Sequence, residues 1–132
     1  MNFLSASGKD AKFLSVIWKT SEIVPGVRFA IYEPTLSKRI ELTRRLYELT
    51  QKNEFLAATG KELEHLELAL ADLLVQKQLV EWGLVEITGL QIDGKPATAT
   101  SLIESGPDKL VTEIASTIRS RCGLDEEERK NS

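Results

Sequence analysis

Apolar residues at every second position mark the first ordered element that the sequence predicts. In the stretch GVRFAIYE, Val27, Phe29 and Ile31 alternate with Arg, Ala and Tyr residues, which is the two-residue period of a half-buried β-strand. The stretch KFLSVIWKT precedes it, and Pro25-Gly26 between them favours a turn, because proline fixes φ and glycine accepts positive φ. These stretches predict an antiparallel β-hairpin, one face of which must pack on helices to be stable.

Apolar spacing of three to four residues then predicts a first long helix. Pro34 ends the strand because proline cannot donate to a sheet, and Thr35 can cap a helix that runs from Leu36 to about Lys52. Basic residues between its apolar positions give this helix a basic outer face. The apolar positions are Leu36, Ile40, Leu46, Tyr47 and Leu49.

A longer helix is predicted from about Lys61 to Gly83, with apolar residues on two sides. The stripes are Leu63, Leu66, Leu70, Leu73 and Val80 on one side, and Leu68, Val75, Leu79 and Trp82 on the other. Because apolar surface on more than one side is typical of a helix surrounded by neighbours, we expect this helix to be the central element of the core. Core packing is favoured over a coiled coil, which needs about three or four clean heptads. Dimerisation through the helix stays open as an alternative.

The stretch LVEITGLQIDGKPAT predicts a short strand or hairpin. Val85 and Ile87 alternate, and Leu90 and Ile92 repeat the pattern. Asp93-Gly94 is the turn signal, since both residues tolerate positive φ.

Two further helices are predicted after this stretch. Ser101 and Glu104 have capping-box spacing for a short helix in TSLIES. Gly106-Pro107-Asp108 opens a last helix that ends at Gly123, the expected left-handed stop. Its apolar face carries Leu110, Val111, Ile114, Ala115, Ile118 and Cys122.

Together these elements predict an α+β fold that is mainly α, with about four helices in a compact domain, an N-terminal β-hairpin and a short second strand pair. The 132 residues fit one domain. We expect residues 12–123 to form it, after a flexible lead over 1–11. Residues 124–132 are predicted to be an exposed acidic and basic tail or a short helix, because Asp125 and Glu128 have capping-box spacing but nothing apolar follows Leu124.

Charge and cysteine content narrow the class of protein. A formal net charge of −3 and a pI of about 5.3 argue against a general polyanion binder. The one cysteine, Cys122, cannot form an internal disulfide, and Met1 to Trp18 lacks the features of a secretory leader. No stretch reaches the roughly 18 consecutive apolar residues of a membrane-spanning helix. We therefore expect a cytoplasmic protein without membrane contact.

The side chains available for chemistry predict a non-enzymatic protein without metal or cofactor. One histidine, His65, and one cysteine exclude metal sites built from several His and Cys ligands. A Cys–His catalytic pair is disfavoured, since His65 lies beside Glu64 and Glu67 whereas Cys122 belongs to an apolar face. The many glutamates of the longer helix are interpreted as a solvated face. Neither a P-loop nor a GxGxxG motif occurs.

Opposite charges on the two long helices indicate protein partners. Between Pro34 and Lys52, basic residues outnumber acidic ones five to two, and between Glu54 and Glu81 acidic residues outnumber basic ones six to two. This pattern favours antiparallel packing, self-assembly or partner docking over DNA binding. The alternative is a small helical nucleic-acid-binding or regulatory protein, whose candidate residues are Lys38, Arg39, Arg44 and Arg45.

Three features of the second half form a further pattern over roughly residues 85–132. They are a strand-like segment with an Asp-Gly turn at Gly89 to Pro96, the helix opening Gly106-Pro107-Asp108, and the charged ending Leu124 to Ser132. On this pattern, and on the order of strand and basic helix in FAIYEPTLSKRIEL, the chain resembles small tail assembly chaperones encoded by tailed bacteriophages and prophages.

The resemblance implies a non-enzymatic protein of the bacterial host cytoplasm, which binds the tape measure protein and tail tube subunits during tail morphogenesis. It also implies a longer frameshift product, so that Ser132 ends one of two forms. A tape measure protein exposes apolar helical surface until tube subunits enclose it, and a small helical partner could shield that surface.

Exposed charge supplies the candidate partner-binding residues. They are Arg39, Arg44 and Arg45 on the basic helix, and Glu126, Glu127, Arg129 and Lys130 in the tail. The alternative is that these side chains form solvated faces without a partner, because surface charges cost little to keep. Association of the chain into a homo-oligomer is also left open.

Overall fold

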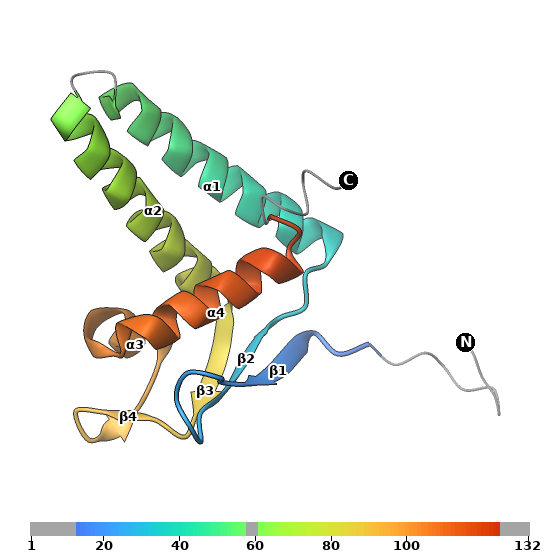
Figure 1. Cartoon of the computed structure of the whole chain (residues 1–132). Helices are drawn as coiled ribbons and strands as arrows, with labels where there is room; N and C mark the ends of the chain where they lie inside the picture. The colour runs from blue at the N-terminus through green and yellow to red at the C-terminus, as the bar shows by residue number, and fades with distance from the viewer. Residues whose placement is uncertain (1–12, 58–60, 125–132) are drawn as a thin grey trace, which may run out of the picture.

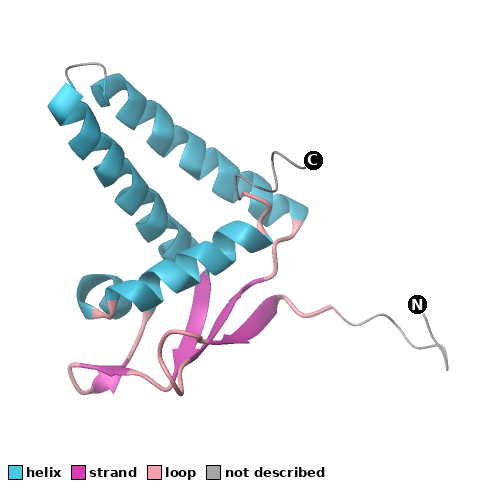
Figure 2. Cartoon of the chain, in the orientation of Figure 1, coloured by secondary structure: helices cyan, strands magenta, loops and turns pink. Residues whose placement is uncertain are grey.

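The structure of the protein, a computed structural model, describes residues 13–57 and 61–124 (Figure 1). The predicted lead over 1–11 and the capping-box residues Asp125 and Glu128 lie outside the described residues. The described part contains four helices and two small antiparallel sheets, which confirms the predicted α+β fold dominated by helices. The helices gather on one side and the strands on the other (Figure 2).

The predicted β-hairpin forms two strands of the larger sheet. β1 (Val16–Thr20) pairs antiparallel with β2 (Arg28–Tyr32). In the connection, the amide of Val27 donates to the carbonyl of Val24 at 3.2 Å, and Gly26 has φ +83°, which is a conformation that glycine adopts without steric cost. The hairpin and its turn are therefore confirmed.

A third strand, β3 (Leu84–Thr88), pairs antiparallel with β2 on the side away from β1. The sequence predicted a strand here without its partner, and it placed Val85 with Ile87 in one alternating pattern. That alternation is wrong: Leu84 and Ile87 are buried, and Val85 is exposed. The cause is a β-bulge in β3: Ala30 of β2 pairs with Glu86 and Ile31 with Leu84, so Val85 has no partner in β2 and the alternation of β3 is interrupted.

The second sheet is the predicted short strand pair. β4 (Gln91–Ile92) pairs antiparallel with β5 (Lys95–Pro96). Asp93 and Gly94 form the turn with φ values of +52° and +78°. Both lie in the left-handed region that the Asp-Gly signal requires, so the turn prediction is confirmed.

α1 (Leu36–Ala57) and α2 (Lys61–Gly83) form a long antiparallel helical hairpin that extends away from the sheet (Figure 1). α2 has the predicted bounds, whereas α1 continues past its predicted end near Lys52. The added residues include Glu, Leu and Ala, which are strong helix formers, so the helix propagates although the apolar spacing fades.

The last two helices are α3 (Ala99–Ser105) and α4 (Asp108–Arg121). The capping box of α3 uses Thr98 and Ser101: each hydroxyl oxygen accepts from the amide of the other residue, at 3.1 and 2.9 Å. Ser101 is therefore inside the helix, and its expected role as the cap paired with Glu104 is corrected.

α4 ends where the sequence predicted. Gly123 follows it with φ +69°, and the amide of Leu124 donates to the carbonyl of Arg119 at 3.0 Å. This left-handed residue reverses the chain and satisfies a carbonyl of the last helical turn.

One core joins the sheet, α3, α4, the C-terminal part of α2 and the N-terminal part of α1. β2 supplies Val27, Phe29 and Ile31, as predicted, and α4 supplies the predicted apolar face. The residues without exposed surface that complete its centre are Leu42, Leu79, Val80, Leu102, Leu110 and Ile114.

A side-chain carboxylate fixes the hairpin connection to α4. Glu113 accepts hydrogen bonds from the Oγ of Ser21 at 2.6 Å and from the amide of Glu22 at 2.7 Å. Ser21 is buried, and its Oγ in turn accepts from the amides of Ile23 and Val24. The loop between β1 and β2 is thus held on α4 by one acid.

We expect Glu113→Ala to lower the free energy of unfolding by about 2 kcal/mol, because hydrogen bonds to a charged acceptor contribute about 1.5–3 kcal/mol. Urea denaturation followed by circular dichroism measures the change. The control is Glu104→Ala, which alters an exposed acid of α3 and is expected to cost under about 0.5 kcal/mol. Equal effects of the two substitutions would contradict this role of Glu113.

Candidate binding surface on the helical hairpin

The two ends of α2 differ sharply in burial. Leu79 and Val80 have no exposed surface and Trp82 is buried, but Leu66, Leu68, Leu70 and Leu73 are each between 50% and 69% exposed. The expectation that neighbours surround this helix is therefore wrong for most of its length. A helix of this size is roughly 35 Å long at 1.5 Å per residue, which exceeds what the sheet, α3 and α4 cover.

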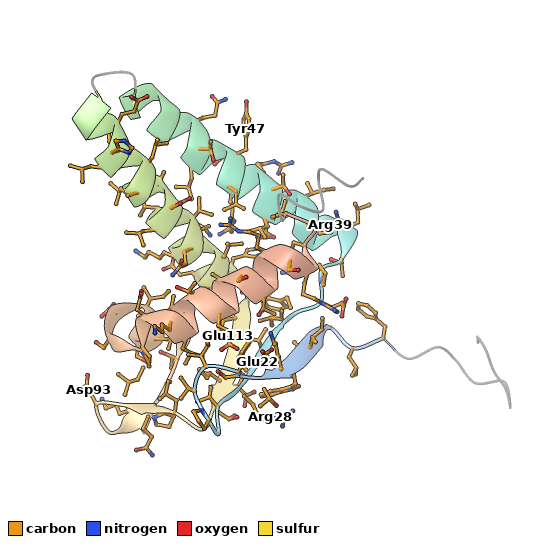
Figure 3. The ribbon with its side chains drawn as sticks, in the orientation of Figure 1. Glu22, Arg28, Arg39, Tyr47, Asp93 and Glu113 are labelled. Atoms are coloured by element: carbon orange, nitrogen blue, oxygen red, sulfur yellow. The ribbon has the colours of Figure 1, made fainter. Side chains whose placement is uncertain are left out.

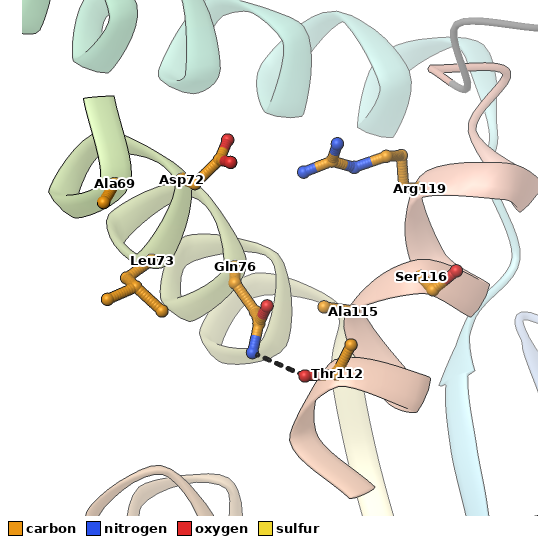
Figure 4. A pocket seen from close by; sticks show the side chains of 8 residues that line it. All are labelled: Ala69, Asp72, Leu73, Gln76, Thr112, Ala115, Ser116 and Arg119. Carbon is orange, nitrogen blue, oxygen red and sulfur yellow. Dashed lines mark hydrogen bonds between the residues drawn. The ribbon is translucent and has the colours of Figure 1, made fainter. Parts of the chain in front are cut away.

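Three of these leucines form a row along α2. Leu66, Leu70 and Leu73 are separated by four and three residues, which places them on one side of a helix. Figure 4 shows the side chain of Leu73 directed away from α1. We call these three residues the α2 stripe. Since half or more of each side chain faces solvent, the stripe is apolar surface without a cover in the described part of the chain.

A groove between α2 and α4 lies beside the α2 stripe (Figure 4). Its volume is about 550 Å³, and it is lined by Ala69, Asp72, Leu73, Gln76, Thr112, Ala115, Ser116 and Arg119. Gln76 donates through Nε2 to the Oγ1 of Thr112 at 3.2 Å and so ties the two helices together. Asp72 of α2 and Arg119 of α4 lie on opposite walls, so the groove combines apolar side chains such as Leu73 with two charged ones.

α1 carries a second exposed apolar row on its outer side. Leu36, Ile40 and Tyr47 are between 49% and 75% exposed, and we call them the α1 stripe. The apolar spacing predicted that Leu36, Ile40 and Tyr47 belong with Leu46 and Leu49 to the apolar side of an amphipathic helix with a basic outer face, but these three are exposed. The buried face contains Leu42, which has no exposed surface, and the partly buried Leu46.

Several basic side chains of α1 make contacts within the protein. Arg45 pairs with Glu41 one turn earlier, with 3.2 Å between Nη2 and Oε2. The Nζ of Lys38 lies 4.6 Å from the ring centroid of Tyr32 and 5.9 Å from that of Trp82, and these distances allow cation–π attraction. The indole of Trp82 also donates to Glu41 at 3.2 Å.

The structure describes three of the seven predicted partner-binding residues. Arg39, Arg44 and Arg45 are exposed on α1, as expected, and Figure 3 labels Arg39 near the start of that helix. The tail residues Glu126, Glu127, Arg129 and Lys130 lie outside the described residues. The stripes on both helices, which sequence reasoning assigned to packing, are the additional candidates.

His65 and Cys122 lie in different environments. Cys122 is buried after the end of α4, as predicted, and burial raises the pKa of its thiol, with the positive charge of Arg39 opposing this weakly. His65 is exposed on α2. Among residues 13–57 and 61–124, no three His, Cys, Asp or Glu side chains cluster as a metal site would require.

Comparisons with known proteins return no relative: no family model, no curated protein and no solved structure matches the chain. None of the helices in the described part has the length and apolar content needed to span a membrane.

Proposed function

We propose that the protein is a non-enzymatic chaperone that binds apolar helical segments of a client, and that it acts as a phage tail assembly chaperone for the tape measure protein and tail tube subunits. The observation that carries the proposal is the exposure of the α2 stripe. The sequence pattern over residues 85–132 supplies the identity of the client.

The physical case rests on exposed apolar area. Surface leucines are ordinary when scattered, whereas a row on one helix face matches the helix-in-groove mode, in which anchors recur every three or four residues. Burying a leucine fully is worth about 1.5–3 kcal/mol. Each leucine of the α2 stripe is at least half exposed, so covering it gains roughly 1 kcal/mol. The adjoining groove adds a recess beside the row.

Nucleic-acid binding is the alternative, and the contacts of α1 weaken its basis. Lys38 is engaged with two aromatic rings and Arg45 with a glutamate. Two of the four candidate bases thus serve intramolecular contacts. Phosphate-driven affinity requires several free cations on one surface, so the chaperone role has the better support.

Co-expression with the tape measure protein of the same genome tests the proposal. We expect the two proteins to co-purify. The double variant Leu70→Asp with Leu73→Asp should retain at least tenfold less of the tape measure protein, because two charges would then lie in the contact. The control is Ile23→Asp, which places the same charge at an exposed apolar position in the loop between β1 and β2. Retention of the client by the double variant, or failure of the native protein to retain it, would exclude this surface as the client site.

A further inference from the structure

We infer that copies of this chain associate head to tail, with the α1 stripe of one copy packed on the α2 stripe of the next. The proposal concerns the free protein and goes beyond client binding. It commits to a second copy as the occupant because the chain itself carries both halves of a complementary contact.

The two stripes point to different sides of the helical hairpin. Tyr47 of the α1 stripe projects from α1 on the side away from α2 (Figure 3), and Leu73 of the α2 stripe projects away from α1 (Figure 4). One copy therefore cannot bring its own stripes together. The α1 stripe of one copy can instead pack on the α2 stripe of a second copy, whose own α1 stripe stays free. Because the contact joins two different surfaces, it is heterologous.

Charge selects this pairing over the symmetric ones. On α1, Arg45 is paired with Glu41 and Lys38 lies over two aromatic rings, and the other described charges are the bases Arg39 and Arg44 and the acid Glu48. Those exposed on α2 include the acids Glu64, Asp72 and Glu81 and the base Lys77, whereas Glu67 is half-buried. A contact of α1 with another α1 would oppose two basic helices, and α2 with α2 two acidic ones. Only α1 with α2 brings opposite charges together, and like-charge contacts are penalised at interfaces.

Within one chain, the charges of α1 are not paired with those of α2 among the described side chains. The ion pairs found among the described side chains are Lys19 with Glu22, Arg45 with Glu41, and Arg121 with Glu33. None of them joins α1 to α2. Arg39 and Arg44, which flank the α1 stripe along the helix, are exposed and remain available to the acids of a neighbouring α2.

The contact covers the surface proposed for the client, so self-association and client binding compete. Its core is three apolar residues on each side, well below the roughly 20–30 residues a side of a standard stable interface. We therefore expect weak, concentration-dependent association, measurable by sedimentation velocity at on the order of 100 μM.

Mixing two interface variants tests the head-to-tail arrangement. Ile40→Asp disables the α1 stripe and Leu70→Asp disables the α2 stripe, so each variant alone should sediment as a monomer. An equimolar mixture should form a dimer and nothing larger, because the intact α1 stripe of one variant meets the intact α2 stripe of the other. Circular dichroism verifies the fold, and Tyr47→Asp replaces Ile40→Asp if the latter unfolds.

Other outcomes of this experiment overturn the inference. A native protein that stays monomeric at that concentration rules out the contact. Self-association that survives in one variant, or a mixture that stays monomeric, indicates a symmetric or different interface. Because no client is present, these results are independent of the co-purification test: a monomeric protein that retains its client leaves the proposed function standing.

Discussion

Replacing Gly89 by alanine should destabilise the protein by roughly 3 to 5 kcal/mol, one of the largest effects of any single substitution. Gly89 follows β3 with φ +82°, and a Cβ built there would lie 2.1 Å from the carbonyl oxygen of Gly26 in the β1–β2 turn. Two costs combine: the left-handed conformation of a residue with a Cβ, and a clash with backbone that cannot rotate aside. The free energy of unfolding from urea denaturation measures the loss.

Gly94→Ala is the matched control for the clash. Gly94 has φ +78°, yet a Cβ there would have no heavy atom within 4 Å. It therefore carries only the conformational cost, about 1 to 2 kcal/mol. The difference in free energy of unfolding between the two variants measures the clash of a Cβ at Gly89 with the backbone of Gly26 in the β1–β2 turn. If both cost the same, the packing of the β3 end against the hairpin turn is not as described.

The turns and the end of the last helix could be predicted from the sequence, because the conformational preferences of a few neighbouring residues determine them. Pro25-Gly26 and Asp93-Gly94 specify their turns through backbone conformations that the residues themselves favour. Gly123 ends α4 for the same reason. The last helix was predicted with its buried face, because a single apolar row on an otherwise polar helix has only one way to pack.

Features that depend on distant parts of the chain were predicted less well. The sequence predicted a strand near Val85, but its partner β2 and the shift of register are set by contacts more than fifty residues apart. α2 was predicted to be central because it is apolar on two sides. Periodicity reports that a face is apolar and cannot report whether the fold covers it.

The candidate surface was missed for the same reason, although the sequence held a signal. A chain with about four helices and short strands has too few elements to surround a helix as long as α2. Counting elements against helix length would have predicted that one end stays uncovered. The exposure of Arg39, Arg44 and Arg45 was predicted, and the pairing of Arg45 with Glu41 has an i,i+4 spacing that the sequence already displays. The contact of Lys38 with Trp82 joins two helices, so only the fold provides it.

One substitution made at two positions of α2 should separate its buried end from its exposed end. Leu79→Ala removes a side chain with no exposed surface and is expected to cost about 3 kcal/mol, since the cavity adds to the lost burial. Leu70→Ala removes one that is 50% exposed and should cost under about 1 kcal/mol. Helix propensity changes equally in both variants, so it cancels from the comparison.

The same pair of variants also tests whether the α2 stripe is uncovered in the free chain, which both proposals require. Urea denaturation at a dilute protein concentration measures the monomer, where no neighbour covers Leu70. A loss at Leu70 that matches the loss at Leu79 would mean that the chain itself buries the α2 stripe, and no partner could then reach it. A small loss there, joined to a large loss of client retention or self-association in Leu70→Asp, assigns this leucine to binding rather than to folding.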